Sequence, residues 1–409
     1  MAKKEPRRFL PYGRHQVTEE DIDAVCEVLR SDWLTQGPTI PLFEKKLSAT
    51  LGSKPAVACS TGTAALHLAM MALDIGPGDA VVTTPITFLA DANCACYVGA
   101  EVRFADIDPE TACMNPDALE RVLAQDTEHR IKAVIPVHFG GQPADLPRIH
   151  SLAEAHGAVV VDDACHAPGA WYEDGEARFG MGGSPHSVMT VLSFHPVKHV
   201  AMGEGGAVLC DDPGLLERLR TFRNHGISRD EPAFAGMAFD ENGDLNPWYY
   251  EMPSPGYNYR VTDIQAALGI SQLERLEHSV KRRNQLADYY RRQLESRFPD
   301  RSVRPLVLRR GVGHAYHLFV VRIDFEKYGV SRSKVMRRLR EAEIGTQVHY
   351  IPLHLQPYYR QLSGTGPGDY PAAEGYYEQA LTLPMYPELE ERDIDRVLDE
   401  LSLALTRES

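Results

Sequence analysis

The stretch Ser193-Phe-His-Pro-Val-Lys198-His-Val-Ala-Met-Gly-Glu-Gly-Gly206 follows a short apolar run, Val188–Leu192, and ends in a glycine-rich turn. An apolar run of this length, bounded by turn residues, predicts a buried strand. A second such run, Ala158–Asp162, lies upstream, and Asp163 comes directly after it. Polar residues that follow buried parallel strands gather at one edge of the sheet, so we expect Lys198 and Asp163 to lie near each other.

The chain between about residues 55 and 210 alternates short apolar runs with helical patterns. Continuous apolar strands separated by helices indicate an α/β fold with a largely parallel sheet covered on both faces. We expect strands at Ala56–Cys59, Ala80–Thr83, Glu101–Asp106, Ile131–Val137, Ala158–Asp162, Val188–Leu192 and Gly206–Leu209. We expect helices at Thr63–Leu73, Phe88–Tyr97, Pro116–Leu123 and Ala144–His156.

The C-terminal part of the chain predicts a second, smaller unit. Residues 228–255 are rich in Gly, Pro, Asp and aromatic residues, which is typical of a long surface loop. A long helix is expected to run from Val261 to about Leu294. We therefore divide the chain into a large domain, residues 1–260, and a linking helix with a smaller α/β domain, residues 261–409. In this domain we expect strands near His317–Ile323 and Ile344–Tyr350, and helices at Ser333–Glu341 and Glu390–Leu405.

The composition excludes several classes of function. The net charge of −14 over 409 residues argues against nonspecific nucleic-acid binding and against an anionic membrane surface. No stretch is apolar enough to span a membrane, and no apolar signal core follows the basic N-terminus. The seven cysteines are scattered, which favours reduced thiols in the cytoplasm. The sixteen histidines lack the spacing typical of zinc ligands, so no metal site is expected.

Lys198 and Asp163 suit one coenzyme, pyridoxal phosphate. Its chemistry needs an amine that forms an imine with the coenzyme aldehyde and then carries protons, and Lys198 fits both tasks. It also needs a carboxylate beside the ring nitrogen. Strand alternation turns Asp162 and Asp163 to opposite faces, so only one of them can serve. We expect Asp163 to do so, with His166 following it; alternatively, either carboxylate caps the next turn.

The motif Ser60-Thr-Gly-Thr63 opens an apolar helical stretch and suits a phosphate site. Free amides and the helix dipole attract a dianion there, and the hydroxyls of Thr63 and Ser193 add donors. Taken alone, the motif is more simply an ordinary helix cap. Phe88 is the candidate for an apolar side chain that stacks on the coenzyme ring; alternatively, it only packs in the core.

These residues resemble the DegT/DnrJ/EryC1/StrS family of sugar aminotransferases over almost the whole chain. Further family-like stretches are Trp33–Gly37, Gly76–Pro85, Ile135–Gly141, Phe222–Gly226, Gly256–Asp263 and Tyr316–Phe319. The resemblance implies the aspartate aminotransferase type fold, fold type I of the pyridoxal phosphate enzymes, and a homodimer with active sites at the subunit interface. It also implies cofactor contacts from Gly62, Thr63, Phe88, Asp163, His166, Ser193 and Lys198, and from Asn258 toward the phosphate of the partner subunit.

The lysine at position 198 discriminates between two activities. Family members with histidine at the corresponding position are dehydratases, so the resemblance implies transamination here. The stretch Ile344–Tyr359 is similar to family members that aminate C4 of a UDP-linked 4-keto-6-deoxy-N-acetylhexosamine in pseudaminic acid biosynthesis, with L-glutamate as donor. Alternatives are another nucleotide-linked or free keto sugar, a dehydratase, or a coenzyme-binding regulator. Weak candidates for substrate contacts, each open to a purely structural role, are Arg229, His349, Tyr350 and His354.

Overall fold

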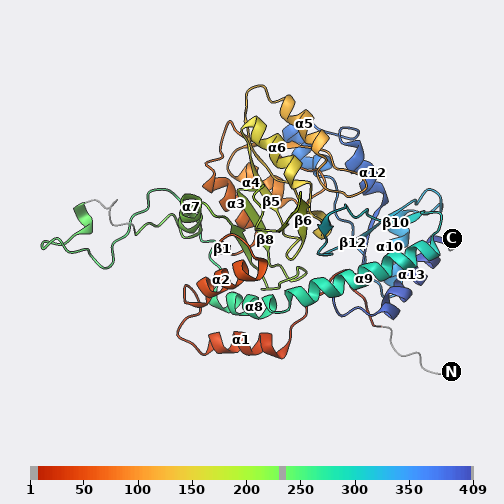
Figure 1. Cartoon of the computed structure of the whole chain (residues 1–409), viewed down its shortest axis with the longest axis horizontal. Coiled ribbons are helices and arrows are strands. Elements are labelled where there is room, and N and C mark those ends of the chain that lie inside the picture. Colours follow the sequence, from red (N-terminus) through yellow and green to blue (C-terminus); the bar gives the residue numbers. More distant parts are fainter. Residues whose placement is uncertain (1–7, 230–235, 407–409) are drawn as a thin grey trace.

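The computed structural model describes residues 8–229 and 236–406. Its large sheet consists of β1 (Ala56–Cys59), β2 (Ala80–Thr83), β3 (Glu101–Phe104), β4 (Ile131–Val134), β5 (Val159–Asp163), β8 (Met189–Ser193) and β9 (Gly206–Leu209). The strand order is β1-β9-β8-β5-β4-β2-β3 (Figure 1). Strand β9 pairs antiparallel with β1 and β8, and the other pairs are parallel. The predicted α/β fold with a mostly parallel sheet is confirmed.

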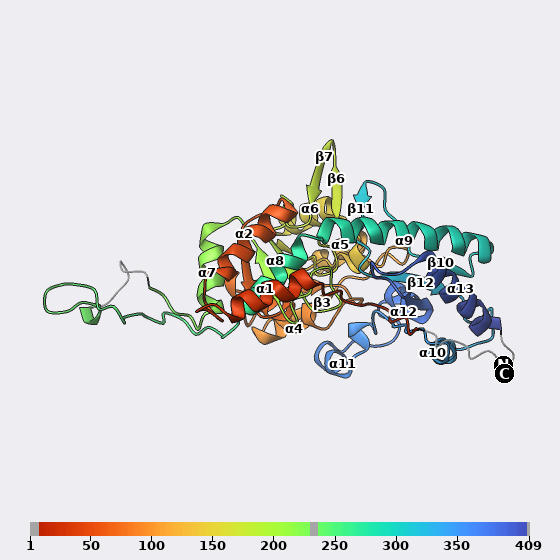
Figure 2. The ribbon, with the colours of Figure 1, turned by 90° about the horizontal axis from the view of Figure 1, so that it is seen from below.

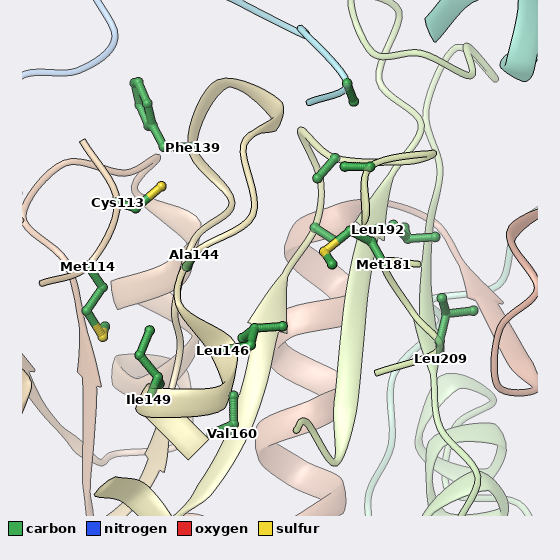
Figure 3. Packing of buried hydrophobic residues seen from close by; sticks show 14 of the residues in the cluster. Cys113, Met114, Phe139, Ala144, Leu146, Ile149, Val160, Met181, Leu192 and Leu209 are labelled. Carbon is green, nitrogen blue, oxygen red and sulfur yellow. The ribbon is translucent and has the colours of Figure 1, made fainter. Parts of the chain in front are cut away.

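Helices cover both faces of this sheet. The helices of the large unit are α1 (Glu19–Leu29), α2 (Thr39–Leu51), α3 (Gly62–Ala72), α4 (Ala90–Tyr97), α5 (Pro116–Ala124), α6 (Leu146–His156), α7 (Pro213–Arg223) and α8 (Asp263–Leu273). On one face, α3, α4 and α7 share a core with Val57 and Val161. On the other, α2, α5, α6 and α8 share a core with Ala58 and Val160. Figure 3 shows part of this second core, with Ile149 of α6 near Val160.

Local sequence signals set where several of these helices begin. Asn115 and Asp212 cap α5 and α7 by accepting backbone N–H bonds, and each is followed by proline. Proline suits this position because its missing N–H has no intrahelical partner there. Thr262 and Gln265 form a reciprocal capping box at the start of α8. These starts could be predicted from the sequence alone.

The C-terminal part has its own core around an antiparallel sheet in the order β10 (Val303–Pro305), β12 (Phe319–Ile323), β13 (Ala380–Leu383). The helix α9 (Leu276–Arg297) runs from the large unit into this one (Figures 1 and 2). Leu276 lies in a core of the large sheet, and Leu286 and Leu294 lie in the C-terminal core. The remaining helices are α10 (Arg332–Glu341), α11 (Pro357–Ser363), α12 (Pro371–Gln379) and α13 (Glu391–Thr406), with short 3-10 turns at Phe139–Gly141, Gly236–Ala238 and Leu353–Leu355.

A third, small sheet was not predicted. It has the order β11 (Val312–Gly313), β6 (Trp171–Asp174), β7 (Ala177–Gly180), and the β6–β7 hairpin projects from the body in Figure 2. None of the helices within the two described ranges is both long and apolar enough to cross a bilayer.

Two expectations for the C-terminal part were wrong. The strand predicted at Ile344–Tyr350 does not form, and this segment makes isolated bridges from Ile344 to Leu10 and from Gln347 to Thr382. Ile344 is buried by packing against neighbouring side chains, without the hydrogen-bond ladder of a sheet. The long helix predicted from Val261 divides into α8 and α9, because the backbone of Arg275 between them leaves helical geometry. The Arg275 side chain forms an ion pair with Asp21 of α1 at 2.6 Å.

The predicted surface loop, residues 228–255, extends far from the body of the molecule (Figure 1). Residues 230–235 of this loop lie outside the described residues. At its base, Ser228 and Glu251 exchange backbone hydrogen bonds of 2.8 and 3.1 Å. Its described part exposes large apolar side chains, with Met237 78% and Trp248 73% exposed. The loop therefore carries surface that this single chain leaves open to solvent.

Candidate active site

The predicted site residues converge at the carboxyl edge of the large sheet. Asp163 ends β5, Ser193 ends β8, and Gly62 opens α3 just after β1. Strands β5 and β8 are parallel neighbours with Asp163 opposite Val191, so their ends lie side by side. This is the edge where open α/β sheets bind ligands.

Lys198 lies in a turn after β8, where its backbone N–H donates to the His195 carbonyl at 2.8 Å. Its side chain is half-buried. Burial lowers the pKa of Lys198, although Cys165, Asp163 and Asp91 nearby favour the cation. A lysine held this way gives up its proton more readily than one in water, which suits a nucleophile and a proton carrier.

Strand alternation separates the two aspartates as predicted. Asp162 faces the α6 side, where its carboxylate oxygens contact His138 Nε2 at 2.9 Å and accept from the Thr190 hydroxyl at 2.7 Å. Asp163 faces the α3 side, 7% exposed, and its Oδ1 accepts the Cys165 N–H at 2.7 Å. Asp162 is thus fully engaged within the core, and Asp163 is the aspartate that lies near Lys198.

The start of α3 forms a close-fitting backbone cradle. Thr61 is the helix cap, and its hydroxyl accepts the Ala64 N–H at 3.0 Å. The amides of Gly62 and Thr63 precede the first intrahelical bond, made by Ala65 to the Thr61 carbonyl. A Cβ atom built on Gly62 would lie 2.9 Å from the Ser193 Cβ. The cap lies at Thr61, and the backbone of Gly62 lies close to Ser193; the phosphate site remains a prediction.

His166 lies buried in a group of aromatic rings. Its Nδ1 accepts the Gly140 N–H at 3.3 Å, so in the neutral ring Nε2 carries the proton and faces the Tyr350 hydroxyl at 3.3 Å. Burial, then the positive charge of Lys198, lower the pKa of His166 well below its ordinary value. The His317 ring is 4.5 Å away between centroids. His166 is therefore a neutral ring close to Lys198.

Two more candidates lie with this group. The Phe88 ring is 55% exposed, and its centroid is 6.1 Å from that of Tyr350. His349 contacts the Thr382 hydroxyl at 2.8 Å, and burial together with Lys198 lowers the pKa of His349 to about 3. Phe88, His349 and Tyr350 are thus gathered on the side of the site that contains His166.

Three candidates are placed apart from this group within the chain. His354 is buried and contacts Glu374 at 3.0 Å, and its other charged neighbours are Asp106 and Asp369. Arg229 is exposed next to residues outside the described ranges. Asn258 is exposed and bridges to Asn224 through the backbone. No group of three or more His, Cys, Asp or Glu residues with metal-binding arrangement occurs in the part of the chain that the structure describes.

Sequence reasoning missed Asp91 and His317. Asp91, in the first turn of α4, is buried against Asp163. Its sequence signal is an acidic residue within the otherwise small and apolar run Leu89-Ala-Asp-Ala92. His317 stands in the family-like stretch Tyr316–Phe319, but nothing in its spacing connects it with His166.

Comparison with known proteins identifies the family of this chain. The model of the DegT/DnrJ/EryC1/StrS aminotransferase family matches residues 15–402. The chain is 41% identical to the spore coat polysaccharide biosynthesis protein SpsC of Bacillus subtilis. The alignment spans 392 residues and covers 96% of each chain.

Solved structures of sugar aminotransferases share the fold. PseC of Helicobacter pylori, an aminotransferase involved in the biosynthesis of pseudoaminic acid, is 28% identical with a TM-score of 0.84, covering 97% of this chain and 99% of PseC. The putative sugar aminotransferase Spr1654 of Streptococcus pneumoniae, in its PLP form, is 28% identical with a TM-score of 0.83, covering 97% and 98%. Its PMP form gives the same values. The fold is thus that of the fold type I pyridoxal phosphate enzymes, and the chain belongs to the DegT/DnrJ/EryC1/StrS family as a pyridoxal phosphate-dependent sugar aminotransferase.

Proposed function

We propose that this enzyme transfers the amino group of L-glutamate to C4 of a UDP-linked 4-keto-6-deoxy-N-acetylhexosamine, as in pseudaminic acid type amino sugar biosynthesis. The observation that carries the transaminase part is Lys198, a half-buried amine beside Asp163 at the carboxyl edge of the sheet. The likeness to PseC over nearly the whole chain supports this class of acceptor.

The residues at this edge fit pyridoxal phosphate. The phosphate needs amide and hydroxyl donors on a backbone that lets it approach closely, and the Gly62 cradle beside Ser193 has both. The ring nitrogen needs a buried carboxylate, and Asp163 supplies one. The residues that would hold the coenzyme are Gly62, Thr63, Phe88, Asp163, His166, Ser193 and Lys198, with Asn258 reaching the phosphate of the partner in a homodimer.

Lys198 is the proton carrier in this proposal. When bound, pyridoxal phosphate supplies an electron sink for the carbanion formed at the donor α-carbon. The neutral Lys198 Nζ takes the proton from that carbon in the first half-reaction and delivers a proton to the sugar carbon in the second. Burial helps because it lowers the pKa of Lys198 toward the working pH. The ring of His166 stays neutral beside it and adds no second positive charge.

The acceptor would bind on the open side of this edge. A keto sugar has no carboxylate to clamp, so its nucleotide is expected to be held by scattered polar rings such as His349 and Tyr350, with Arg229 and His354 as weaker candidates. Because Asn258 and large apolar side chains in the described part of the 228–255 loop are exposed in the single chain, we expect a second copy to complete the site in the cytoplasm.

A second candidate is the amination of a different keto sugar. The relative at 41% identity, SpsC, is described as a spore coat polysaccharide biosynthesis protein, which favours a sugar destined for a surface polysaccharide. The two candidates share the coenzyme and Lys198 and differ in the acceptor alone.

Isotope transfer tests the donor and the acceptor together. We expect enzyme supplied with ¹⁵N-labelled L-glutamate and the UDP-linked 4-keto sugar to produce an amino sugar containing the heavy nitrogen, measured by mass spectrometry. Glutamine labelled only at its side-chain amide is the control and should transfer no label. Transfer to another keto sugar but not to this one would replace the first candidate by the second, and amination without label from glutamate would refute the donor.

A further inference from the structure

Asp91 is a buried acid that the proposed mechanism leaves unused. It lies in the first turn of α4 and is 1% exposed. Its Oδ2 accepts a hydrogen bond from the Thr87 hydroxyl. Its Oδ1 is buried and receives no N–H or O–H donor from the described residues. An ionised carboxylate with one oxygen unsatisfied is costly to bury, so its surroundings must compensate in some other way.

The compensating group is the Asp163 carboxyl. The two side chains lie within hydrogen-bonding contact, although neither is a donor when ionised. Two carboxylates in contact cannot both keep their charge, so one of them must hold a proton. A shared proton turns an unfavourable contact into a hydrogen bond to a charged acceptor, which is among the stronger kinds.

The surroundings decide which carboxyl is neutral. Asp163 already accepts the Cys165 N–H at 2.7 Å and lies near Lys198, so its position suits the hydrogen-bond acceptor of the pair. Burial, then the charge of Asp163, raise the pKa of Asp91 well above its ordinary value. The first turn of a helix favours an anion, but this effect is smaller than the cost of burying an unpaired charge.

We propose that Asp91 is a positioning residue whose carboxyl, in its neutral acid form, donates a hydrogen bond from Oδ1 to Asp163 and thereby orients the Asp163 carboxylate toward the coenzyme ring nitrogen. The inference rests on the role of Asp163 in the proposed function. Asp163 is then held by two donors, the Cys165 amide and Asp91.

The first test uses the coenzyme-free protein and compares the wild type with Asp91→Asn. Asparagine has the same shape, can donate to Asp163, and is neutral at every pH. The ionisable groups that face Asp91 are Asp163, Lys198, Cys94, Cys165 and Tyr350. They are the same in both proteins, so the difference in the free energy of unfolding isolates Asp91.

The sign of the pH dependence follows from linkage. Because the pKa of Asp91 is raised in the folded state, the stability contributed by its acid form is complete below the ordinary carboxyl range, about pH 4, and is lost as the pH rises. We therefore expect Asp91→Asn to be more stable than the wild type at pH 7, with a gap that narrows on acidification. A variant less stable at pH 7, or a gap independent of pH, would overturn the inference.

The second test observes the coenzyme through ¹⁵N at its ring nitrogen by NMR, with the dissociation constant measured alongside. Asp91→Asn is expected to keep the wild-type chemical shift and bind within about twofold. Asp91→Leu keeps the volume but removes the donor, and should weaken coenzyme binding roughly tenfold and move the shift toward the unprotonated value. If the leucine variant does not fold, Asp91→Ala replaces it.

These outcomes distinguish the inference about Asp91 from the proposed role of Asp163. Wild-type coenzyme affinity and chemical shift in the leucine or alanine variant would refute any role for Asp91. An asparagine variant with affinity as low as in those variants would show that Asp91 acts through its charge, which would refute the neutral acid form. An Asp163→Asn variant with an unchanged ring-nitrogen signal would instead refute the role of Asp163, whatever Asp91 does.

Discussion

Lys198→Ala is expected to abolish transamination, lowering turnover by about 10⁴-fold or more, because the variant loses both the amine that holds the coenzyme and the group that moves the proton. The measurement is the steady-state rate with L-glutamate as donor, together with circular dichroism to verify folding.

Lys132→Ala is the matched control for this variant. Lys132 is exposed near the amino end of β4, at the sheet edge opposite Asp163, and its Nζ contacts the His129 carbonyl at 2.9 Å. We expect this control to keep wild-type turnover. A Lys198→Ala protein that folds and still aminates a keto sugar from glutamate at a substantial fraction of the wild-type rate would refute the mechanism.

Asp163→Asn is expected to lower turnover by roughly 10²- to 10³-fold, about 3–4 kcal/mol of transition-state stabilisation, because the ring nitrogen loses its proposed charged partner. The variant should still fold, because asparagine can accept the Cys165 N–H in place of the carboxylate. Its bound coenzyme should show an altered absorption spectrum, since the ring nitrogen loses its anionic partner. Turnover and the spectrum are measured on the same preparation.

Asp162→Asn makes the same change one residue earlier on the opposite face of β5. Asp162 pairs with His138 and Thr190 in the core, so this variant should lose about 1–3 kcal/mol of unfolding free energy and keep the coenzyme spectrum. The opposite pattern, with the spectrum changed in Asp162→Asn and kept in Asp163→Asn, would show that the two aspartates had been assigned to the wrong faces.

The large domain could be predicted because its signals are local. Most strands of the central sheet are short apolar runs, and β1, β2 and β9 were predicted with the bounds that the structure shows. The period-two alternation of β5 predicted that Asp162 and Asp163 face opposite sides of the sheet, and the choice of Asp163 rested on His166, which follows it. Antiparallel pairing of β9 could not be read in the same way, since an apolar run is equally compatible with both directions.

The C-terminal domain was harder to predict because its contacts are distant in sequence. The segment contains the β-branched residues Ile344, Thr346 and Val348, which favour a strand. It forms isolated bridges instead, from Ile344 to Leu10 and from Gln347 to Thr382. The break between α8 and α9 lies at Arg275, whose ion-pair partner Asp21 is more than two hundred residues away in the sequence. Local propensity contains no information about either partner.

Within the site, too, residues with local sequence signals could be predicted and residues defined by distant contacts could not. Lys198 and Asp163 were found because each follows a recognisable strand. Asp91 was missed because its significance arises from contact between helix α4, which contains it, and Asp163 at the end of β5. His354 was proposed as a substrate contact, and its ion pair with Glu374 could not be inferred from a histidine in a proline-rich turn.

The most direct test of the central claim is to identify the lysine that holds the coenzyme. Enzyme loaded with pyridoxal phosphate is treated with borohydride, which makes the attachment permanent, and its peptides are analysed by mass spectrometry. We predict that the coenzyme mass is found on the peptide that contains Lys198 and is absent from that peptide without borohydride. Coenzyme attached to a different lysine, or no labelled peptide from a fully loaded enzyme, would contradict the account.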